Sequence, residues 1–440
     1  MRFFDKIFRP TSLAAPTTEA AAPSVAFGRY SDGNKSPQQL ADWNASMAAF
    51  DRQDFVIAFD HFFRYLKDAA EENVFVERQN GRVHFVIFQG SNRVSGFANE
   101  RWLRAEAKLA KADMLNVGFM RRLLEQNFAL KYGRYALDGD NNIVLIFDSY
   151  TLDCSPYKLY YALREIALLA DKQDDLLLDE FKMLQPATPS AGLQITISEQ
   201  EKKVKYDFVV SQINAVLTQI NHIDAERNAP AVAYLLLHLC YKLDYLVKPE
   251  GVMMETLERV HRTFFSNEEK TSLQKNNAVR REFEQLLLRS KSDFLKEFYR
   301  TKATFGLTNT TTHEQLLSFI GGELKNLESY ANHPNEAVEL AIMGYAVAFS
   351  LFNYALLAPD TALLHLYLEI LESDYFQSLG YSLPHADLGA PKLVRQRVKD
   401  VAKANADKFP KFCPNTDRLD FNSKAAFAKS YLQMLLQTIV

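Results

Sequence analysis

Hydrophobic and polar residues follow two different patterns along the chain, and the change falls near residue 190. Before that point apolar residues recur at helical spacing over 54–71 and 116–130, and again after Ser155-Pro156, a pair typical of a helix start. Between these helices lie runs rich in β-branched and aromatic residues, which favour strands. The predicted order is helix, three strands, helix, two strands, helix, with strands at 73–79, 82–89, 102–111, 132–137 and 142–148.

Two turns join these strands into hairpins. Asn80-Gly81 separates the first two strands, and Asn-Gly tolerates the positive φ angles of a tight hairpin turn. Asp138-Gly139-Asp140-Asn141 separates the last two strands. The pattern therefore predicts an antiparallel sheet with helices packed on it, a two-layer α+β domain over residues 50–185.

The central strands are apolar on both faces. Strand 82–89 places one apolar set on each side, and strand 142–148 does the same. Because a two-layer domain exposes one face of its sheet, something must cover the second face. The cover can be the domain's own helices, a dimer mate, the C-terminal region or a client polypeptide. The candidate partner-binding residues on that face are His84, Val86, Phe88, Val144 and Ile146.

Beyond a linker at 186–198, which contains two prolines and a glycine, residues 199–440 are predicted to form an all-helical domain. Residues 231–243 are apolar nearly all round, so this helix is expected at the centre of a bundle. The predicted helices are 199–224, 229–247, 250–265, 267–302, 312–331, 335–358, 360–376, 390–405 and 422–439.

Residues 1–49 are interpreted as a flexible N-terminal tail. Met1–Arg9 can form two helical turns with an apolar side, and a Pro/Ala/Thr/Ser-rich stretch follows it. This tip is either a docking peptide, a weak membrane-surface anchor or a frayed terminus. Asp5 and Lys6 interrupt its apolar run, so it is not a secretory signal.

One segment, Leu340–Ala358, carries no charge and approaches the length of a membrane span. Glu336, Glu339 and Asp360 bracket it, and acidic flanks anchor a cytoplasmic helix end poorly. A buried bundle helix explains the same residues. We therefore expect no stable membrane insertion.

Composition narrows the functional classes. The chain has 440 residues, 48% of them hydrophobic, and a net charge of −3, which gives no overall attraction to nucleic acid. Its cysteines, Cys154, Cys240 and Cys413, are odd in number and far apart, so a disulfide framework is not expected and a cytoplasmic location fits.

No complete catalytic motif is present in the sequence. His313-Glu314 begins like a zinc-protease motif, but Leu317 stands where the second histidine belongs. Asp138-x-Asp140-x-Asn142 begins like a calcium loop, but Ile143 stands where the loop needs glycine. We therefore predict no metal, no cofactor and no enzymatic activity.

One stretch of the chain resembles the second half of the class I type III secretion chaperone fold, as found in the Tir-chaperone group and the YbjN-like bacterial proteins. It runs from Asn127 to Phe147 and reads NFALKYGRYALDGDNNIVLIF. These proteins share the predicted order of helices and strands. The resemblance covers roughly residues 50 to 185, whereas the long helical region departs from the family. The structural residues of the motif are Asn127, Gly133, Arg134, Asp138 and Gly139.

Together these patterns predict a two-domain α+β protein that binds a polypeptide without catalysis, as a chaperone holds a client. A homodimer is a further partner that the resemblance implies. The alternative is a structural adaptor, in which the helical domain is itself the partner of the chaperone-like domain and recruits other proteins.

Overall fold

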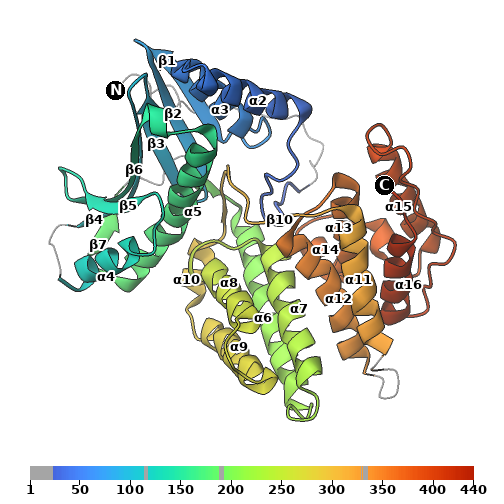
Figure 1. Ribbon diagram of the computed structural model, residues 1–440. Helices are drawn as coiled ribbons and strands as arrows, with labels where there is room; N and C mark the ends of the chain where they lie inside the picture. Colours follow the sequence, from blue (N-terminus) through green and yellow to red (C-terminus); the bar gives the residue numbers. More distant parts are fainter. Residues whose placement is uncertain (1–22, 113–116, 188–192, 329, 331–334) are drawn as a thin grey trace. The chain divides into compact units, whose positions relative to one another are not determined.

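The structure is a computed structural model that describes residues 23–112, 117–187, 193–328, 330 and 335–440. The chain divides into two compact units. Among the described residues, the α+β unit contains 35–196 and 299–306, and the helical unit contains 23–34, 197–298 and 307–440 (Figure 1). The mixed α+β class, with an antiparallel sheet in the N-terminal half and helices in the C-terminal half, is therefore confirmed.

A sheet of seven strands forms the centre of the described α+β unit. Its strand order is β1-β2-β3-β4-β6-β5, and every pairing is antiparallel. Strand β7 pairs with the C-terminal end of β4. The strands are β1 (Val74–Gln79), β2 (Arg82–Gln89), β3 (Asn92–Ala98), β4 (Trp102–Ala112), β5 (Arg134–Leu137), β6 (Asn142–Tyr150) and β7 (Leu184–Pro186).

The predicted element order lacks one strand, because β3 stands where the sequence analysis predicted none. Its sequence, NRVSGFA, has few apolar residues and a glycine in the middle, which weakens the alternation that marks a strand. The glycine has a structural reason. A Cβ at Gly96 would lie 2.1 Å from the carbonyl oxygen of Arg104 and 2.5 Å from the ring of Phe85.

Helices cover one face of this sheet. In the described part of the unit the α-helices are α2 (Pro37–Asp51), α3 (Phe55–Leu66), α4 (Val117–Asn127) and α5 (Pro156–Glu180). Helices α3 and α5 bury their apolar sides against β2, β3, β4 and β6 (Figure 1). Phe63 of α3 stacks on Phe85 of β2, with ring centroids 4.4 Å apart. Both rings are buried, and burial of a phenylalanine side chain contributes about 1.5–3 kcal/mol to the free energy of folding.

Helix α2 lies where the sequence analysis expected a flexible tail. Ser36 caps it in a capping box with Gln39, and Pro37 occupies its first turn. Trp43 packs against Tyr65 of α3 and Tyr157 of α5 at centroid distances of 4.8 and 5.0 Å. The tryptophan thus holds α2 on the unit. The predicted amphipathic tip, Met1–Arg9, lies outside the described residues.

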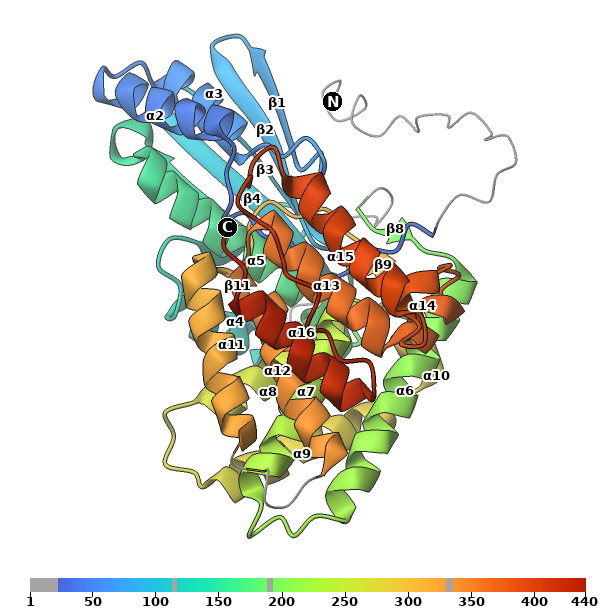
Figure 2. The ribbon, with the colours of Figure 1, turned by 90° about the vertical axis from the view of Figure 1, so that its right-hand side faces the viewer.

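The helical unit contains most of the helices predicted from periodicity. They are α6 (Glu199–Asn221), α7 (Ala229–Val247), α8 (Gly251–Phe265), α9 (Ser272–Leu287), α10 (Lys291–Lys296), α11 (His313–Glu328), α12 (Glu336–Asn353), α13 (Ala358–Leu371), α14 (Ser373–Ser378), α15 (Pro391–Asn405) and α16 (Lys424–Leu436). Helix α7 is buried on nearly every side, as predicted, and packs along α12. Figure 2 shows α13 beside α15 and α16.

Helix α12 settles the reading of the apolar segment. It is long and apolar enough to cross a membrane, but 72% of its most apolar window is buried inside the structure. Its residues belong to the same core as α7. The prediction of a buried bundle helix is confirmed.

The single helix predicted at 267–302 is wrong. Thr271 and Ser290 each accept a hydrogen bond from a backbone N–H three residues on, so they start the separate helices α9 and α10. The chain then becomes extended in β9 (Tyr299–Arg300), which pairs with β8 (Ile195–Thr196). A second short pair joins β10 (Asn309–Thr310) to β11 (Tyr354–Ala355) in the helical unit.

Two segments depart from the predicted domain limits of 50–185 and 199–440. Residues 23–34 belong to the helical unit, although they precede the sheet in sequence. Residues 299–306 belong to the α+β unit, although helices flank them in sequence. Hydrophobic periodicity could not reveal either segment, because both are short and extended.

Candidate functional site: an extended segment held by the α+β unit

The predicted partner-binding residues fall into two separate groups on the sheet. His84, Val86 and Phe88 lie on β2, whereas Val144 and Ile146 lie on β6. Strands β3 and β4 run between them. At about 4.8 Å per strand, the two groups are roughly 14 Å apart. They do not form one apolar surface.

Polar and charged side chains occupy the strands between the two groups. Ser95 faces Val86 across the β2–β3 pair, and Glu106 faces Ile146 across the β4–β6 pair. Residues directly opposite each other share a face, so this face carries polar groups at its centre. The face that the sequence suggested to be apolar is therefore apolar only in places.

Val144 and Ile146 are buried among these charged neighbours. Lys108 lies opposite Val144, and Arg134 lies opposite Ile146. The Arg134 guanidinium donates to Asp148 at 2.6 Å, and the Lys108 ammonium donates to Asp138 at 2.9 Å. Long side chains such as these cover apolar residues with their stems while their charged ends reach water. Neither Val144 nor Ile146 is open to a partner.

Val86 and Phe88 are covered by later parts of the same unit. They form a small cluster with Leu193 and the half-buried Phe75. The Lys302 ammonium lies 5.7 Å from the Phe88 ring centroid, a cation–π distance. His84 is half-buried, with its ring 6.3 Å from that of Phe97. In this structure the chain itself covers the surface that a client would need.

The segment responsible for part of this cover is residues 299–306. It begins with the β8–β9 pair and continues with a bridge between Gly90 and Lys302, in which Gly90 N–H donates to the Lys302 carbonyl at 2.9 Å. Thr304 is fully buried, and its hydroxyl donates to the Phe88 carbonyl at 2.8 Å. The segment is thus bonded to the end of β2.

Gln89 recognises the backbone of this segment. Its Oε1 accepts from the N–H of Thr304 at 3.1 Å and from the N–H of Phe305 at 2.9 Å. Both bonds are buried, so water does not compete for them. One side-chain amide therefore fixes the position of two consecutive peptide groups.

Phe305 anchors the segment in the core of the α+β unit. Its ring is buried and lies edge-on to Tyr160 of α5 at 5.5 Å. One turn further along α5, Arg164 donates to the Gly306 carbonyl at 2.9 Å. An aromatic anchor, a buried threonine and a side-chain amide bonded to backbone together recognise an extended polypeptide. We call residues 299–306 the inserted segment.

Sequence reasoning missed Gln89, Thr304 and Phe305. Gln89 ends an apolar strand, which gives no sign of its role. Residues 303–306, Ala-Thr-Phe-Gly, continue no helical period, and that interruption was the signal that could have revealed an insertion.

Two motif residues of the family resemblance, Asn127 and Gly133, contact the elements around β5. Asn127 Oδ1 accepts from the Tyr135 N–H at 2.7 Å, which ties the end of α4 to β5. Gly133 lies against Ile166, where a Cβ would come within 2.7 Å of Cγ2. Its N–H donates to Glu165 Oε1 at 2.8 Å. These contacts position β5 beside α5.

Asp138 organises the turn between β5 and β6. Its carboxylate accepts from Lys108 Nζ at 2.9 Å, from Asn142 Nδ2 at 2.7 Å and from the Asp140 N–H at 2.9 Å. Partial burial opposes ionisation, but these hydrogen bonds outweigh it and hold the pKa of Asp138 well below its usual range. Gly139 has open space around it. The turn needs no bound calcium to be satisfied.

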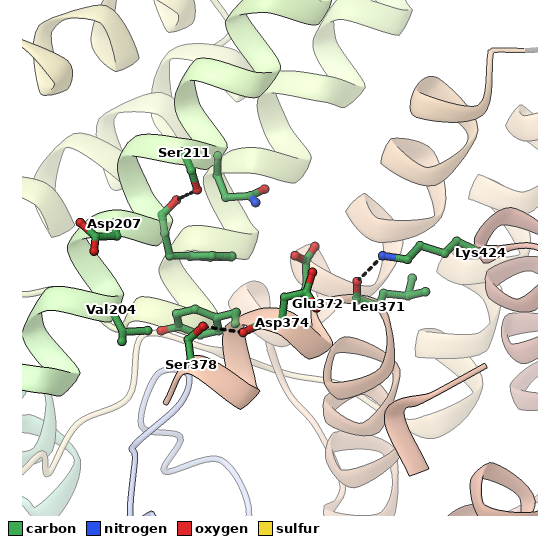
Figure 3. A pocket seen from close by; sticks show the side chains of 11 residues that line it. Val204, Asp207, Ser211, Leu371, Glu372, Asp374, Ser378 and Lys424 are labelled. Atoms are coloured by element: carbon green, nitrogen blue, oxygen red, sulfur yellow. Dashed lines mark hydrogen bonds between the residues drawn. The ribbon is translucent and has the colours of Figure 1, made fainter. Parts of the chain in front are cut away.

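The helical unit contains a pocket of about 570 Å³ between α6, the junction of α13 and α14, and α16 (Figure 3). Several of its polar groups donate to backbone carbonyls nearby. Lys424 donates to the Leu371 carbonyl at 3.3 Å, and the Ser211 and Ser378 hydroxyls donate to carbonyls of their own helices. No histidine or cysteine lines it, and its titratable side chains are those of Asp207, Glu372, Asp374, Tyr375 and Lys424.

The remaining reactive side chains are buried or dispersed. Burial raises the pKa of the Cys154 thiol to about 12, so it is protonated at neutral pH. His238, His261 and His365 have separate surroundings. Among the described residues, no three metal-binding side chains form a group that could hold an ion.

Comparison with known proteins gives no match: no family model, no curated protein and no solved structure is significantly similar to this chain. The resemblance to secretion chaperones therefore stays a prediction. The candidate site depends on the geometry of the inserted segment alone.

Proposed function

We propose that the protein is a non-catalytic adaptor whose α+β unit is a polypeptide-binding module. The observation that supports this proposal is the inserted segment, an extended stretch that comes from the helical half of the sequence and is held by Gln89, Tyr160 and Arg164. The module is thus occupied in cis. Its occupant links the two halves of the sequence.

This occupancy favours the adaptor over a chaperone with an open client surface. Val86 and Phe88 already pack against Leu193, and Lys302 lies over Phe88. A client at this place would have to displace parts of the chain. Their buried hydrogen bonds would then need new partners.

A partner has a more accessible surface on α4. Val117 is 85% exposed, Leu124 is 66% exposed, and Phe128, just after the helix, is 96% exposed. Their spacing of seven and four residues places them along one side of the helix. We call these three residues the α4 stripe. Exposed apolar groups of this kind often mark interaction sites, so an adaptor would recruit a protein here.

The module is tested with a fluorescein-labelled peptide of residues 297–308 and the full-length variant Thr304→Ala/Phe305→Ala. The double substitution weakens the cis occupant, so the variant should bind the peptide, measured by fluorescence anisotropy. Wild-type protein should bind at least about tenfold more weakly, because its own segment competes at high effective concentration. A peptide with alanine at both positions is the matched control.

The proposal fails if a folded variant binds neither peptide, or binds both equally. The inserted segment would then be an ordinary part of the fold. If the double variant does not fold, Phe305→Leu alone provides the same test, because it weakens the anchor of the inserted segment and leaves Gln89, Tyr160 and Arg164 of the module unchanged.

A further inference from the structure

The helical unit has a second place that holds an extended segment, centred on Arg29. Its guanidinium donates to Asp244 through Nε at 2.9 Å and through Nη2 at 2.6 Å, and Nη1 donates to Glu258 at 3.1 Å. Its central carbon lies 4.0 Å from the centroid of the Phe352 ring. Two carboxylates and an aromatic face are the groups that recognise arginine.

These groups come from three different helices. Asp244 is on α7, Glu258 is on α8, and Phe352 is on α12. Arg262 also donates to Glu258, at 3.3 Å, which helps to orient that carboxylate. The helical unit therefore assembles the arginine site from its own helices, and only the arginine comes from the N-terminal segment.

The site is nearly sealed from water. The Asp244 side chain is 4% exposed and that of Arg29 is 12% exposed. An isolated carboxylate at the depth of Asp244 is strongly unfavourable, so the site requires a cation. A guanidinium fits better than an ammonium, because it pairs with Asp244 through two nitrogens while it stacks on Phe352.

The two residues before Arg29 add sequence specificity. Gly28 N–H donates to the Tyr245 carbonyl at 2.8 Å, and its φ is +67°. A Cβ there would lie 2.6 Å from the Tyr245 ring, so glycine is required. The position before an arginine thus has no room for any side chain.

Phe27 fills an aromatic pocket beside the arginine site. Its ring centroid lies 5.1 Å from that of His365, 5.2 Å from Phe376 and 6.2 Å from Tyr381. Residues 23–34 contain no helix or strand, so side chains rather than a backbone ladder carry this recognition. We call residues 23–34 the strap.

We propose that the helical unit contains a binding site for an extended peptide with the order aromatic residue, glycine, arginine, and that the strap occupies this site in cis. A peptide of the same chemistry in trans binds there whenever the strap is released. This site is independent of the proposed function, because its groups belong to the helical unit, whereas the inserted segment belongs to the α+β unit.

The test uses the full-length variant Phe27→Ala/Arg29→Ala and a synthetic peptide of residues 23–34. The peptide should raise the melting temperature of the variant by about 2 °C or more at saturating concentration, because a ligand that binds only the folded state stabilises it. The matched control is the same peptide with citrulline at position 29, which keeps the shape of arginine and removes its charge. It should leave the melting temperature unchanged.

Two further variants keep the result decisive. Adding Asp244→Asn to the double variant should abolish the effect of the arginine peptide. If the double variant does not fold, Arg29→Lys replaces it, because this variant keeps a cation against Asp244. The arginine peptide should raise the melting temperature of Arg29→Lys more than it raises that of the wild-type protein. The proposal is overturned if the citrulline peptide works as well as the arginine peptide, or if neither folded variant responds.

Discussion

The His313 ring and the Asp360 carboxylate form a buried pair, with Nδ1 and Oδ1 2.8 Å apart. The other ring nitrogen, Nε2, lies 2.9 Å from the Thr438 carbonyl oxygen, which can only accept a hydrogen bond. A neutral histidine has one N–H and cannot donate to both oxygens. The pair therefore holds an additional proton, either on the ring or on the carboxyl group.

This pair predicts a pH dependence of stability. Burial raises the pKa of Asp360 above its usual value, although His313 opposes the shift. Because the pKa is raised in the folded state, protonation of Asp360 stabilises the fold. This contribution is complete below the pKa of the unfolded state, near 4, and it is lost as the pH rises through the pKa of the folded state. Asp360→Asn removes that titration. Relative to wild type, the variant should therefore gain unfolding free energy between pH 4 and pH 8, measured by urea denaturation.

The matched substitution His313→Ala should behave differently. It leaves Asp360 buried without its partner and the Thr438 carbonyl without a donor. Removal of one member of a buried pair costs about 3–5 kcal/mol. If Asp360→Asn instead loses stability relative to wild type over the same pH range, the shared proton is not present.

Glycine 96 gives a prediction about packing. A Cβ at this position would lie 2.1 Å from the Arg104 carbonyl, which is backbone and cannot turn away. Gly96→Ala should lower the unfolding free energy by about 1–3 kcal/mol in urea denaturation, because β3 and β4 must separate. Gly139→Ala is the control, since nothing lies within 4 Å of the added Cβ. Equal stability of the two variants would contradict the close approach of these strands.

Asn127 provides a test of the motif. Its Oδ1 accepts from the Tyr135 N–H at 2.7 Å, and its Nδ2 donates to the Tyr135 carbonyl at 3.4 Å. Asn127→Ala leaves that N–H unpaired and should cost about 1–3 kcal/mol of unfolding free energy. Asn127→Asp keeps the acceptor and should cost less. The side chain would have no bridging role if both variants unfolded at the wild-type urea concentration.

Most of the regular elements were predictable, and the extended segments were not. Residues 55–66 and 229–247 carry strong helical periodicity, and Asn80-Gly81 marks a hairpin, so local sequence was sufficient for them. The inserted segment and the strap have no period. Their positions depend on single contacts such as Phe305 with Tyr160 and Arg29 with Asp244. Such contacts join residues far apart in the chain and leave no local pattern.

The arrangement of the candidate site residues was not predictable for a related reason. Alternation showed that Val86 and Val144 face away from the helices, but it could not show which strands separate them. The sheet order places β3 and β4 there. One signal was present: Asp244 and Lys242 are buried charges in a largely apolar helix, so each required a partner of opposite charge from elsewhere in the chain.

Charge substitutions distinguish core residues from surface residues on the α+β unit. Val144 is fully buried, so Val144→Glu should unfold the unit or leave the protein insoluble, because burying an unpaired carboxylate costs several kcal/mol. Leu124 on the α4 stripe is 66% exposed, so Leu124→Glu should change the unfolding free energy by no more than about 0.5 kcal/mol. Soluble expression and circular dichroism melting report both effects. If Val144→Glu folds normally while Leu124→Glu precipitates, the assignment of the buried and exposed surfaces is reversed, and the partner surface must be sought on the sheet.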